Sequence, residues 1–238
     1  MRTIFWNVDT QYDFMRDDEE HKGALPIDDA KSIEKNLELL TNYAREKDFL
    51  TINSADEHTF DDEEISDTPD FIMTFPPHCM RGTKGVEYIP ATKPGFHFGI
   101  HYDEEILDLE LLHRFQSVTI YKNKFDVFTG NPHTEDIVES LKPATAIVYG
   151  VATNVCVDFA VMGLLEREVT VYVVQDAIKE LPNLPLEETL NKWKEAGAKF
   201  ITTHEVVKPG GLGTILEYAA FDLEDQSRFE REQRSYTE

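Results

Sequence analysis

The stretch I-V-Y-G-V-A-T-N-V-C-V-D-F-A-V-M-G-L-L, residues 147–165, predicts a strand that turns directly into a helix. An apolar run at residues 146–149 forms the strand, and the small residues Gly150, Ala152 and Thr153 suit a tight turn. The helix then carries apolar side chains on one face at the spacing i, i+3, i+4, i+7, i+8, namely Val157, Ala160, Val161, Leu164 and Leu165.

Cys156 falls in the first turn of that helix. A thiol at this position meets the positive end of the helix dipole and unpaired backbone N–H groups, and both favour the thiolate. The same turn could supply backbone donors to an oxyanion. The alternative is that Cys156 is a small buried core residue, as free cysteines often are.

The rest of the chain repeats the alternation of strands and helices. We predict further strands at residues 3–8, 49–54, 118–121, 169–174 and 199–202, and helices at 30–46, capped by Asp28 or Asp29, and at 186–196, ended by Gly197. Strands that alternate with helices form a parallel sheet covered on both faces. The expected fold is a three-layer α/β architecture (αβα) with a mostly parallel, six-stranded, Rossmann-like sheet.

Length and composition narrow the class of protein. The 238 residues fit one α/β domain, which we expect over residues 1–238, with a helical and charged C-terminal extension from about residue 204. A formal net charge of −23 makes nucleic acid or an anionic membrane a poor partner. With no signal-peptide pattern, no long apolar run and two cysteines, we expect a cytoplasmic protein with reduced thiols. Homo-oligomer formation and the role of the acidic tail are left open.

Charged residues end two of the predicted strands. Asp9 follows the first buried strand, where open α/β sheets place their ligands, although it could simply cap a turn. Lys122 and Lys124, after the strand at 118–121, compete as a buried cation near such a site, and either could be a surface lysine.

A second group of residues has the chemistry of a metal site. Asp56 and His58 are two apart, so in extended chain both point to one side and can reach one ion. His78, from the F-P-P-H-C-M-R-G-T-K-G motif in the long irregular segment 61–108, would be a third ligand. Cys79 is an alternative soft ligand. A fourth ligand could come from Glu63, Glu64 or Asp67. Zinc is expected first, with iron or manganese as alternatives.

Four pieces in this order resemble the isochorismatase-like cysteine hydrolase superfamily, and within it the nicotinamidases. They are D-T-Q-Y-D-F with G-A-L-P; D-E-H followed by P-P-H-C-M-R-G-T-K-G; K-N-K-F-D-V-F; and G-V-A-T-N-V-C-V. The H-C-x-x-G-T-x-G element after D-x-H is what points to nicotinamidases rather than to relatives without a metal.

The resemblance implies a role for each matching residue. Asp9, Lys122 and Cys156 match the catalytic triad; Asp56, His58 and His78 match the metal ligands; Phe14 and Phe75 match the aromatic pair that holds the pyridine ring; Ala152 and Cys156 supply the oxyanion N–H groups, next to a Val151–Ala152 peptide that is cis in the family. Phe75 replaces the tryptophan of many members, and the loop between His58 and His78 is long and acidic.

The implied activity is hydrolysis of nicotinamide to nicotinic acid and ammonia, a step of NAD salvage, through a thioester and with one divalent metal ion. Three alternatives remain. The chain could be an N-carbamoyl or ureido amide hydrolase without a metal, a zinc-stabilised binding protein without catalysis, or a hydrolase whose zinc-bound water is the nucleophile.

Overall fold

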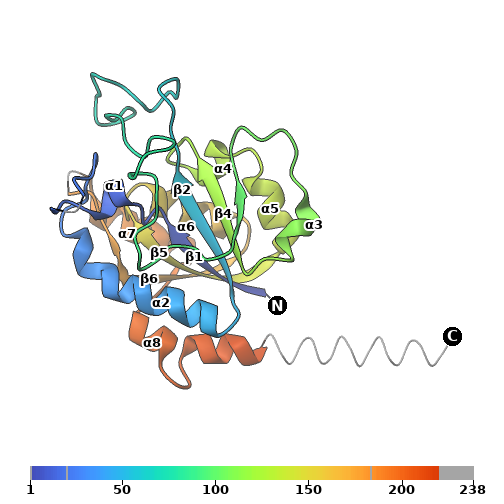
Figure 1. Cartoon of the computed structure of the whole chain (residues 1–238). Coiled ribbons are helices and arrows are strands. Elements are labelled where there is room, and N and C mark those ends of the chain that lie inside the picture. The colour runs from blue at the N-terminus through green and yellow to red at the C-terminus, as the bar shows by residue number, and fades with distance from the viewer. Residues whose placement is uncertain (1, 20, 183, 220–238) are drawn as a thin grey trace, which may run out of the picture.

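A parallel sheet runs through the centre of the computed structural model, which describes residues 2–19, 21–182 and 184–219 (Figure 1). Its seven strands lie in the order β3-β4-β2-β1-β5-β6-β7. They are β1 (Arg2–Val8), β2 (Leu50–Asp56), β3 (Phe98–Ile100), β4 (Ser117–Lys122), β5 (Pro143–Val151), β6 (Thr170–Lys179) and β7 (Lys199–Ile201). Each pairing between these strands is parallel, which confirms the predicted fold class.

The sheet has seven strands and not the predicted six. The additional strand, β3, comes from the segment 61–108 that we predicted to be irregular, and it pairs with β4 through Phe98, Gly99 and Ile100. A strand of three residues is too short to show an alternating pattern, and β3 pairs on one side only because it lies at the edge of the sheet.

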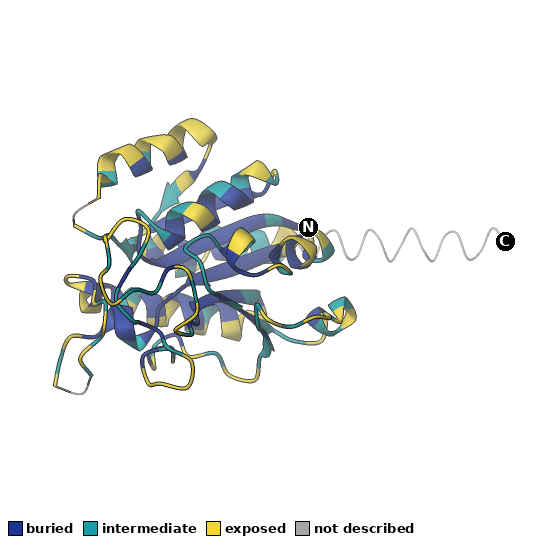
Figure 2. Cartoon of the chain, turned by 90° about the horizontal axis from the view of Figure 1, so that it is seen from above, coloured by how far each residue is buried: buried dark blue, intermediate teal, exposed yellow. Residues whose placement is uncertain are grey.

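Helices cover both faces of the sheet, as predicted. The helices are α1 (Tyr12–Met15), α2 (Glu34–Glu46, after a 3₁₀ turn at Ala30–Ile33), α3 (Leu109–Leu112), α4 (Val127–Gly130), α5 (Thr134–Leu141), α6 (Cys156–Glu166), α7 (Leu186–Ala196) and α8 (Thr203–Val207). One apolar core packs α5, α6 and Trp193 of α7 against alternate strand residues such as Trp6 and Val148. The other packs α2 and α8 against their neighbours Phe5 and Ile147. Figure 2 shows the buried sheet between these outer layers.

The predicted helix ends were partly right. Gly197 ends α7 in the left-handed conformation that glycine adopts most easily. Asp29 stands before the 3₁₀ turn, but its side chain makes no capping hydrogen bond and lies 3.2 Å from Lys179 Nζ instead.

The C-terminal extension is described only in part. Residues 212–219 are helical, and the charged residues from 220 onward lie outside the described residues. The assignment of residues 1–238 to one domain stays a prediction. None of the helices in the described part of the chain combines the length and the apolarity that a bilayer crossing requires.

Sheet topology brings the charged strand ends together. In the register of the sheet, Val8 of β1 lies beside Ser54 of β2 and Gly150 of β5, and Asp56 of β2 lies beside Lys122 of β4. Asp9, Asp56, Lys122 and the start of α6 therefore meet at one edge, at the carboxyl ends of adjacent strands.

Candidate active site

Lys122 lies at the centre of a buried group of charged side chains. Its Nζ atom is 3.0 Å from Asp9 Oδ2 and 3.6 Å from Cys156 Sγ, and it also donates a hydrogen bond to Asp56 Oδ1. The competing candidate, Lys124, is half-exposed and faces Glu63 instead. The structure thus brings the three predicted residues Asp9, Lys122 and Cys156 into one cluster.

Burial shifts the pKa values of this cluster. It raises the pKa of the Cys156 thiol well above the ordinary value, and Lys122 only partly opposes this effect. This effect of burial opposes the effect that we expected from the helix terminus. Burial also raises the pKa of Asp9, against the attraction of Lys122, which makes this carboxylate a better base.

Asp9 is held in place from a neighbouring strand. Ser54 Oγ donates a hydrogen bond to Asp9 Oδ1 at 2.8 Å, and the Tyr88 hydroxyl donates to the Ser54 carbonyl at 2.6 Å. The other oxygen, Oδ2, faces Lys122. The carboxylate is thus oriented to take a proton from Cys156 and to deliver it elsewhere.

The turn before α6 offers free backbone donors. Within the described residues, neither the Ala152 N–H nor the Cys156 N–H has a hydrogen-bond acceptor. The Val151–Ala152 peptide that separates β5 from this turn is cis, as the resemblance implies. Both N–H groups are therefore available to an oxyanion.

Asp56, His58 and His78 form a buried group whose potential ligand atoms all lie within 4.8 Å of one another. Asp56 Oδ2 is 3.8 Å from His78 Nε2 and 4.0 Å from His58 Nε2. The His58 ring is fully buried, yet neither of its nitrogens has a hydrogen-bond partner among the described residues. Burial lowers the pKa of His58 to about 4, which keeps the imidazole neutral. An unpartnered neutral imidazole beside a carboxylate fits a divalent metal ion.

Of the three candidates for a further ligand, Glu63 and Asp67 are exposed and Glu64 is buried, although Glu64 is not part of the clustered group. The Oε1 atom of Glu64 accepts a hydrogen bond from the Phe125 N–H at 2.8 Å, and its Oε2 atom has no partner among the described residues. Burial raises its pKa to about 7. Glu63 points to solvent. Cys79, the alternative soft ligand, is buried outside this group, with its Sγ atom 3.8 Å from the Gly85 carbonyl oxygen.

Asp62 lies beside His58 on the side away from Asp56, beyond hydrogen-bond distance of the ring. Asp62 Oδ2 is 3.9 Å from His58 Nδ1 and accepts a hydrogen bond from the Thr59 N–H, while Oδ1 accepts from the Asn123 amide. A carboxylate behind a histidine ligand orients the ring and raises its basicity. The sequence reasoning missed this residue, although its place four positions after His58 in the acidic run was visible.

We therefore expect Asp62→Asn to weaken metal binding about tenfold or more, because the asparagine keeps the shape but not the negative charge. Calorimetric titration of the metal-free protein with Zn²⁺ measures this directly. Asp103→Asn is the matched control, since Asp103 is bonded to Arg81 and does not contact the metal group. An unchanged zinc affinity in Asp62→Asn would remove the supporting role.

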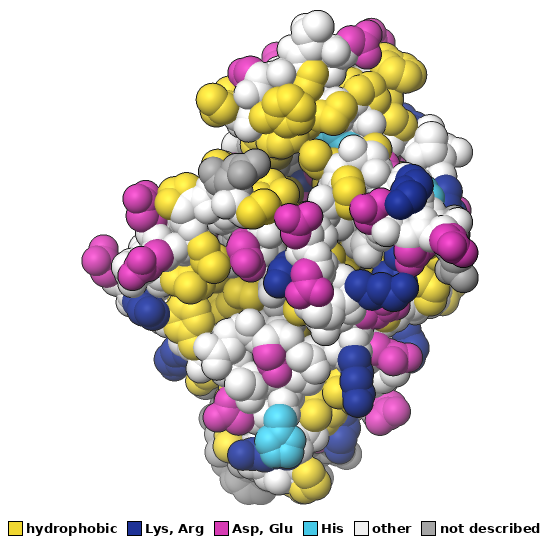
Figure 3. Space-filling view, turned by 90° about the vertical axis from the view of Figure 1, so that its left-hand side faces the viewer, with side chains coloured by type: hydrophobic (Ala, Val, Ile, Leu, Met, Phe, Trp, Pro, Cys, Tyr) yellow, Lys and Arg dark blue, Asp and Glu magenta, His cyan; other side chains and the backbone are white. Residues whose placement is uncertain are grey.

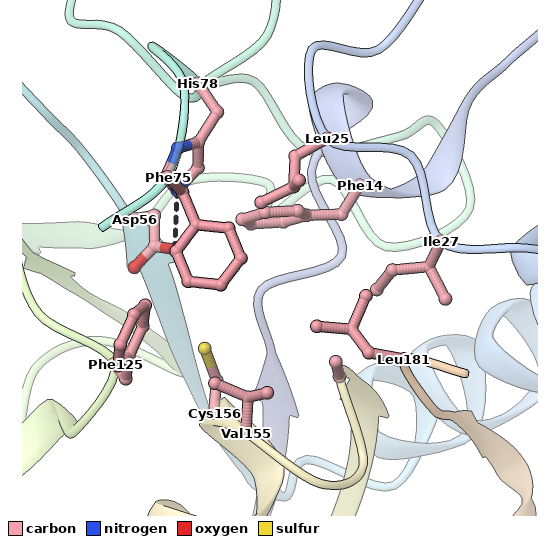
Figure 4. A pocket seen from close by; sticks show the side chains of 11 residues that line it. Phe14, Leu25, Ile27, Asp56, Phe75, His78, Phe125, Val155, Cys156 and Leu181 are labelled. Carbon is pink, nitrogen blue, oxygen red and sulfur yellow. Dashed lines mark ion pairs between the residues drawn. The ribbon is translucent and has the colours of Figure 1, made fainter. Parts of the chain in front are cut away.

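An apolar pocket opens between the cysteine and the metal group (Figure 4). Phe14 and Phe75 line it as predicted, with Cys156 at one end, His78 at the other, and Asp56 between them, within 4.8 Å of Cys156. Five further lining residues had no role in the sequence analysis: Leu25, Ile27, Phe125, Val155 and Leu181. Ala152, predicted only as an oxyanion donor, also lines the pocket. Phe125 packs edge-on against Phe75, with ring centroids 5.5 Å apart. The only feature of the sequence that could have indicated Phe125 as a pocket residue is its position three residues after Lys122.

The pocket is narrow, at about 30 Å³, which is room for roughly one water molecule. Phe75 belongs to the segment that rises above the sheet at the top of Figure 1. The tip of this segment exposes Phe71, Ile72 and Met73, and hydrophobic side chains gather at the same height in Figure 3. Asp70 Oδ1 ties the tip together by accepting three backbone N–H bonds at 2.9 Å.

Comparison with known proteins identifies the family. The Isochorismatase domain family matches residues 3–205. The chain belongs to the isochorismatase family. No curated protein sequence matches it.

Solved structures share the fold of this isochorismatase domain. The nicotinamidase/pyrazinamidase from Bacillus subtilis is 22% identical, with a TM-score of 0.63 over 84% of this chain and 99% of its own. The pyrazinamidase of Pyrococcus horikoshii, solved in complex with zinc, is 22% identical, with a TM-score of 0.64 over 85% and 99%. The N-carbamoylsarcosine amidase from Thermoplasma acidophilum is 19% identical, with a TM-score of 0.66 over 87% and 100%. At these identities the likeness establishes the fold and not the substrate.

Proposed function

We propose that this isochorismatase-family protein is a cysteine amidohydrolase with one divalent metal ion, zinc before iron or manganese, that hydrolyses nicotinamide to nicotinic acid and ammonia. The observation that carries the proposal is the pocket itself: Cys156 lies at one end, His78 of the metal group at the other, and the aromatic rings of Phe14 and Phe75 line the space between. Such a pocket suits a flat ring with a carboxamide on one side and a lone pair on the other.

The reaction would proceed in two halves. The Cys156 thiol gives its proton to Asp9, and its sulfur attacks the carboxamide carbon. The oxyanion accepts hydrogen bonds from the Ala152 and Cys156 N–H groups, each worth about 3–4 kcal/mol in measured systems. Asp9 then protonates the leaving nitrogen, so ammonia departs and a thioester remains. In the second half, Asp9 takes a proton from water and the water oxygen displaces the sulfur. Asp9 then returns the proton to Cys156, and nicotinic acid leaves.

Lys122 and the metal group would have supporting roles. The buried ammonium contacts both Asp9 and Cys156, so it stabilises the negative charge that passes between them. When bound, the metal supplies a Lewis acid for the ring nitrogen. Asp56, His58 and His78 would hold it, which positions the ring rather than activating a water.

The composition of the pocket favours a neutral aromatic amide over an N-carbamoyl amino acid. The latter carries a carboxylate, which needs a cationic partner. Among the described residues that line the pocket there is no lysine or arginine. Aromatic contacts with Phe14 and Phe75 would instead add roughly 0.5–1.5 kcal/mol to the binding of a ring. A nicotinamidase reaction would place the protein in NAD salvage, and a cytoplasmic location stays a prediction.

Ammonia release from a small panel of amides, with metal analysis of the same sample, tests the proposal. We expect nicotinamide and pyrazinamide to be cleaved and benzamide, which lacks the ring nitrogen, to be a much poorer substrate. Equal cleavage of benzamide and nicotinamide would show that the metal does not recognise the ring, and a general amidase would then be the better description. Activity on N-carbamoyl amino acids alone would favour the rival amidase.

A further inference from the structure

Three of the described arginines, Arg2, Arg45 and Arg114, have no carboxylate partner, and two of them, Arg45 and Arg114, line one cavity at the end of the sheet opposite the candidate active site. In this acidic chain, Arg16, Arg81 and Arg167 are paired with glutamate or aspartate. Arg45, near the end of α2, and Arg114, in the turn before β4, have no such partner among the described residues. An unneutralised guanidinium pair in a chain of net charge −23 is a site for an anion.

Arg45 and Arg114 line one cavity of about 320 Å³, a size typical of small-molecule clefts. The cavity opens at the amino ends of β2 and β4, where Thr51 pairs with Ser117. Its described lining includes no aspartate or glutamate. The charged side chains in this lining are therefore both basic.

The same cavity carries an open aromatic face. The Phe115 ring stacks on Phe96, with centroids 5.0 Å apart and planes 30° apart, and on Phe98 at 5.4 Å and 23°. Phe96 is 88% exposed, so its ring is free to stack on a further planar group. Stacking on an aromatic side chain is how proteins hold nucleobases without reading their sequence.

A second cavity of about 290 Å³ provides an internal comparison. It also contains basic side chains, Lys142 and Arg167, but Glu135 and Glu139 line it too, and Arg167 is already bonded to Glu135. It has no aromatic residue in its described lining. Cavity size and a basic residue are thus shared by both sites, whereas the free guanidinium pair and the exposed ring distinguish the first.

We propose that the cavity of Arg45, Arg114 and Phe96 binds a nucleotide-type ligand, with a planar base on Phe96 and a phosphate between the two guanidinium groups. Arginine forks match phosphate oxygens with paired hydrogen bonds. The site is separate from the pocket of Cys156, because it lies at the opposite ends of β2 and β4. The proposal does not depend on the amidase function.

Isothermal titration of the full-length protein with AMP tests the proposal. We expect one saturable site whose affinity falls with added salt, and binding about tenfold or more weaker for adenosine, which lacks the charge, and for ribose 5-phosphate, which lacks the base. Nicotinamide should not displace AMP, because it would occupy the other pocket.

Matched variants locate the bound nucleotide. Arg114→Gln and Phe96→Ala should each weaken AMP binding about tenfold or more, and Lys142→Gln, in the comparison cavity, should leave it unchanged. Both altered side chains are exposed at the surface, so circular dichroism should show an intact fold. Absence of saturable AMP binding, an unchanged affinity in Arg114→Gln, or equal affinity for AMP and ribose 5-phosphate would overturn the proposal.

Discussion

Replacement of Cys156 by alanine should abolish amide hydrolysis and leave the fold intact. The substitution removes the only sulfur that touches both Lys122 and the pocket in the described part of the chain, and loss of a nucleophile costs several orders of magnitude in rate. The side chain is small, so the surrounding core of α6 changes little. Ammonia release under saturating nicotinamide measures the effect, and circular dichroism checks the fold.

Cys79 provides the control for this experiment. It is fully buried, burial raises its pKa well above the ordinary value, and it lines no wall of the pocket. Cys79→Ala should retain activity, and iodoacetamide should label Cys156 before Cys79. If Cys156→Ala stays active, the cysteine mechanism is wrong, and a metal-bound water becomes the better candidate for the nucleophile.

Substitution of His58 or His78 by alanine should remove the bound metal and most of the activity. Each variant leaves two of the three clustered ligands, which is too few to hold a divalent ion firmly. The fold should persist, because the two apolar cores on either side of the sheet do not depend on this group. Elemental analysis of the purified protein gives the metal content, and we expect one ion per chain in the unaltered protein.

His101→Ala is a suitable control, since His101 bonds to Glu57 and stands outside the metal group. Its metal content and activity should be close to those of the unaltered chain. An unaltered protein without metal, or a His58→Ala variant with full metal content, would contradict the assignment of these ligands.

The meeting of Asp9, Lys122 and Cys156 was predictable because of how parallel sheets are built. Each residue follows a strand with a clear apolar run, and the carboxyl ends of neighbouring parallel strands share one edge. The resemblance to the isochorismatase-like hydrolases added the roles, and the family match over residues 3–205 confirms the membership. The roles themselves stay predictions until the variants are measured.

Other features depend on contacts between distant segments, and sequence spacing does not encode them. Leu181, after β6, and Phe125, after β4, line the same pocket, but no periodic pattern links them. The choice of Glu64 over Glu63 follows from which side chain the loop turns inward. The raised pKa of Cys156 follows from its burial, and a local argument from the helix terminus cannot weigh that burial.

The narrow pocket must widen before an aromatic amide can enter it. One wall is fixed: Asp13 accepts hydrogen bonds from the Ala24 and Cys79 N–H groups, so the segments of Leu25 and His78 are tied to α1. The opposite ring, Phe75, belongs to the segment whose tip Asp70 holds together as a unit. Phe75 is joined to Glu64 and Ser66 by backbone hydrogen bonds, so admission of an aromatic amide requires the Phe75 side chain or this segment to move. The association rate of the amide should therefore follow the frequency of this movement and stay below the diffusion limit.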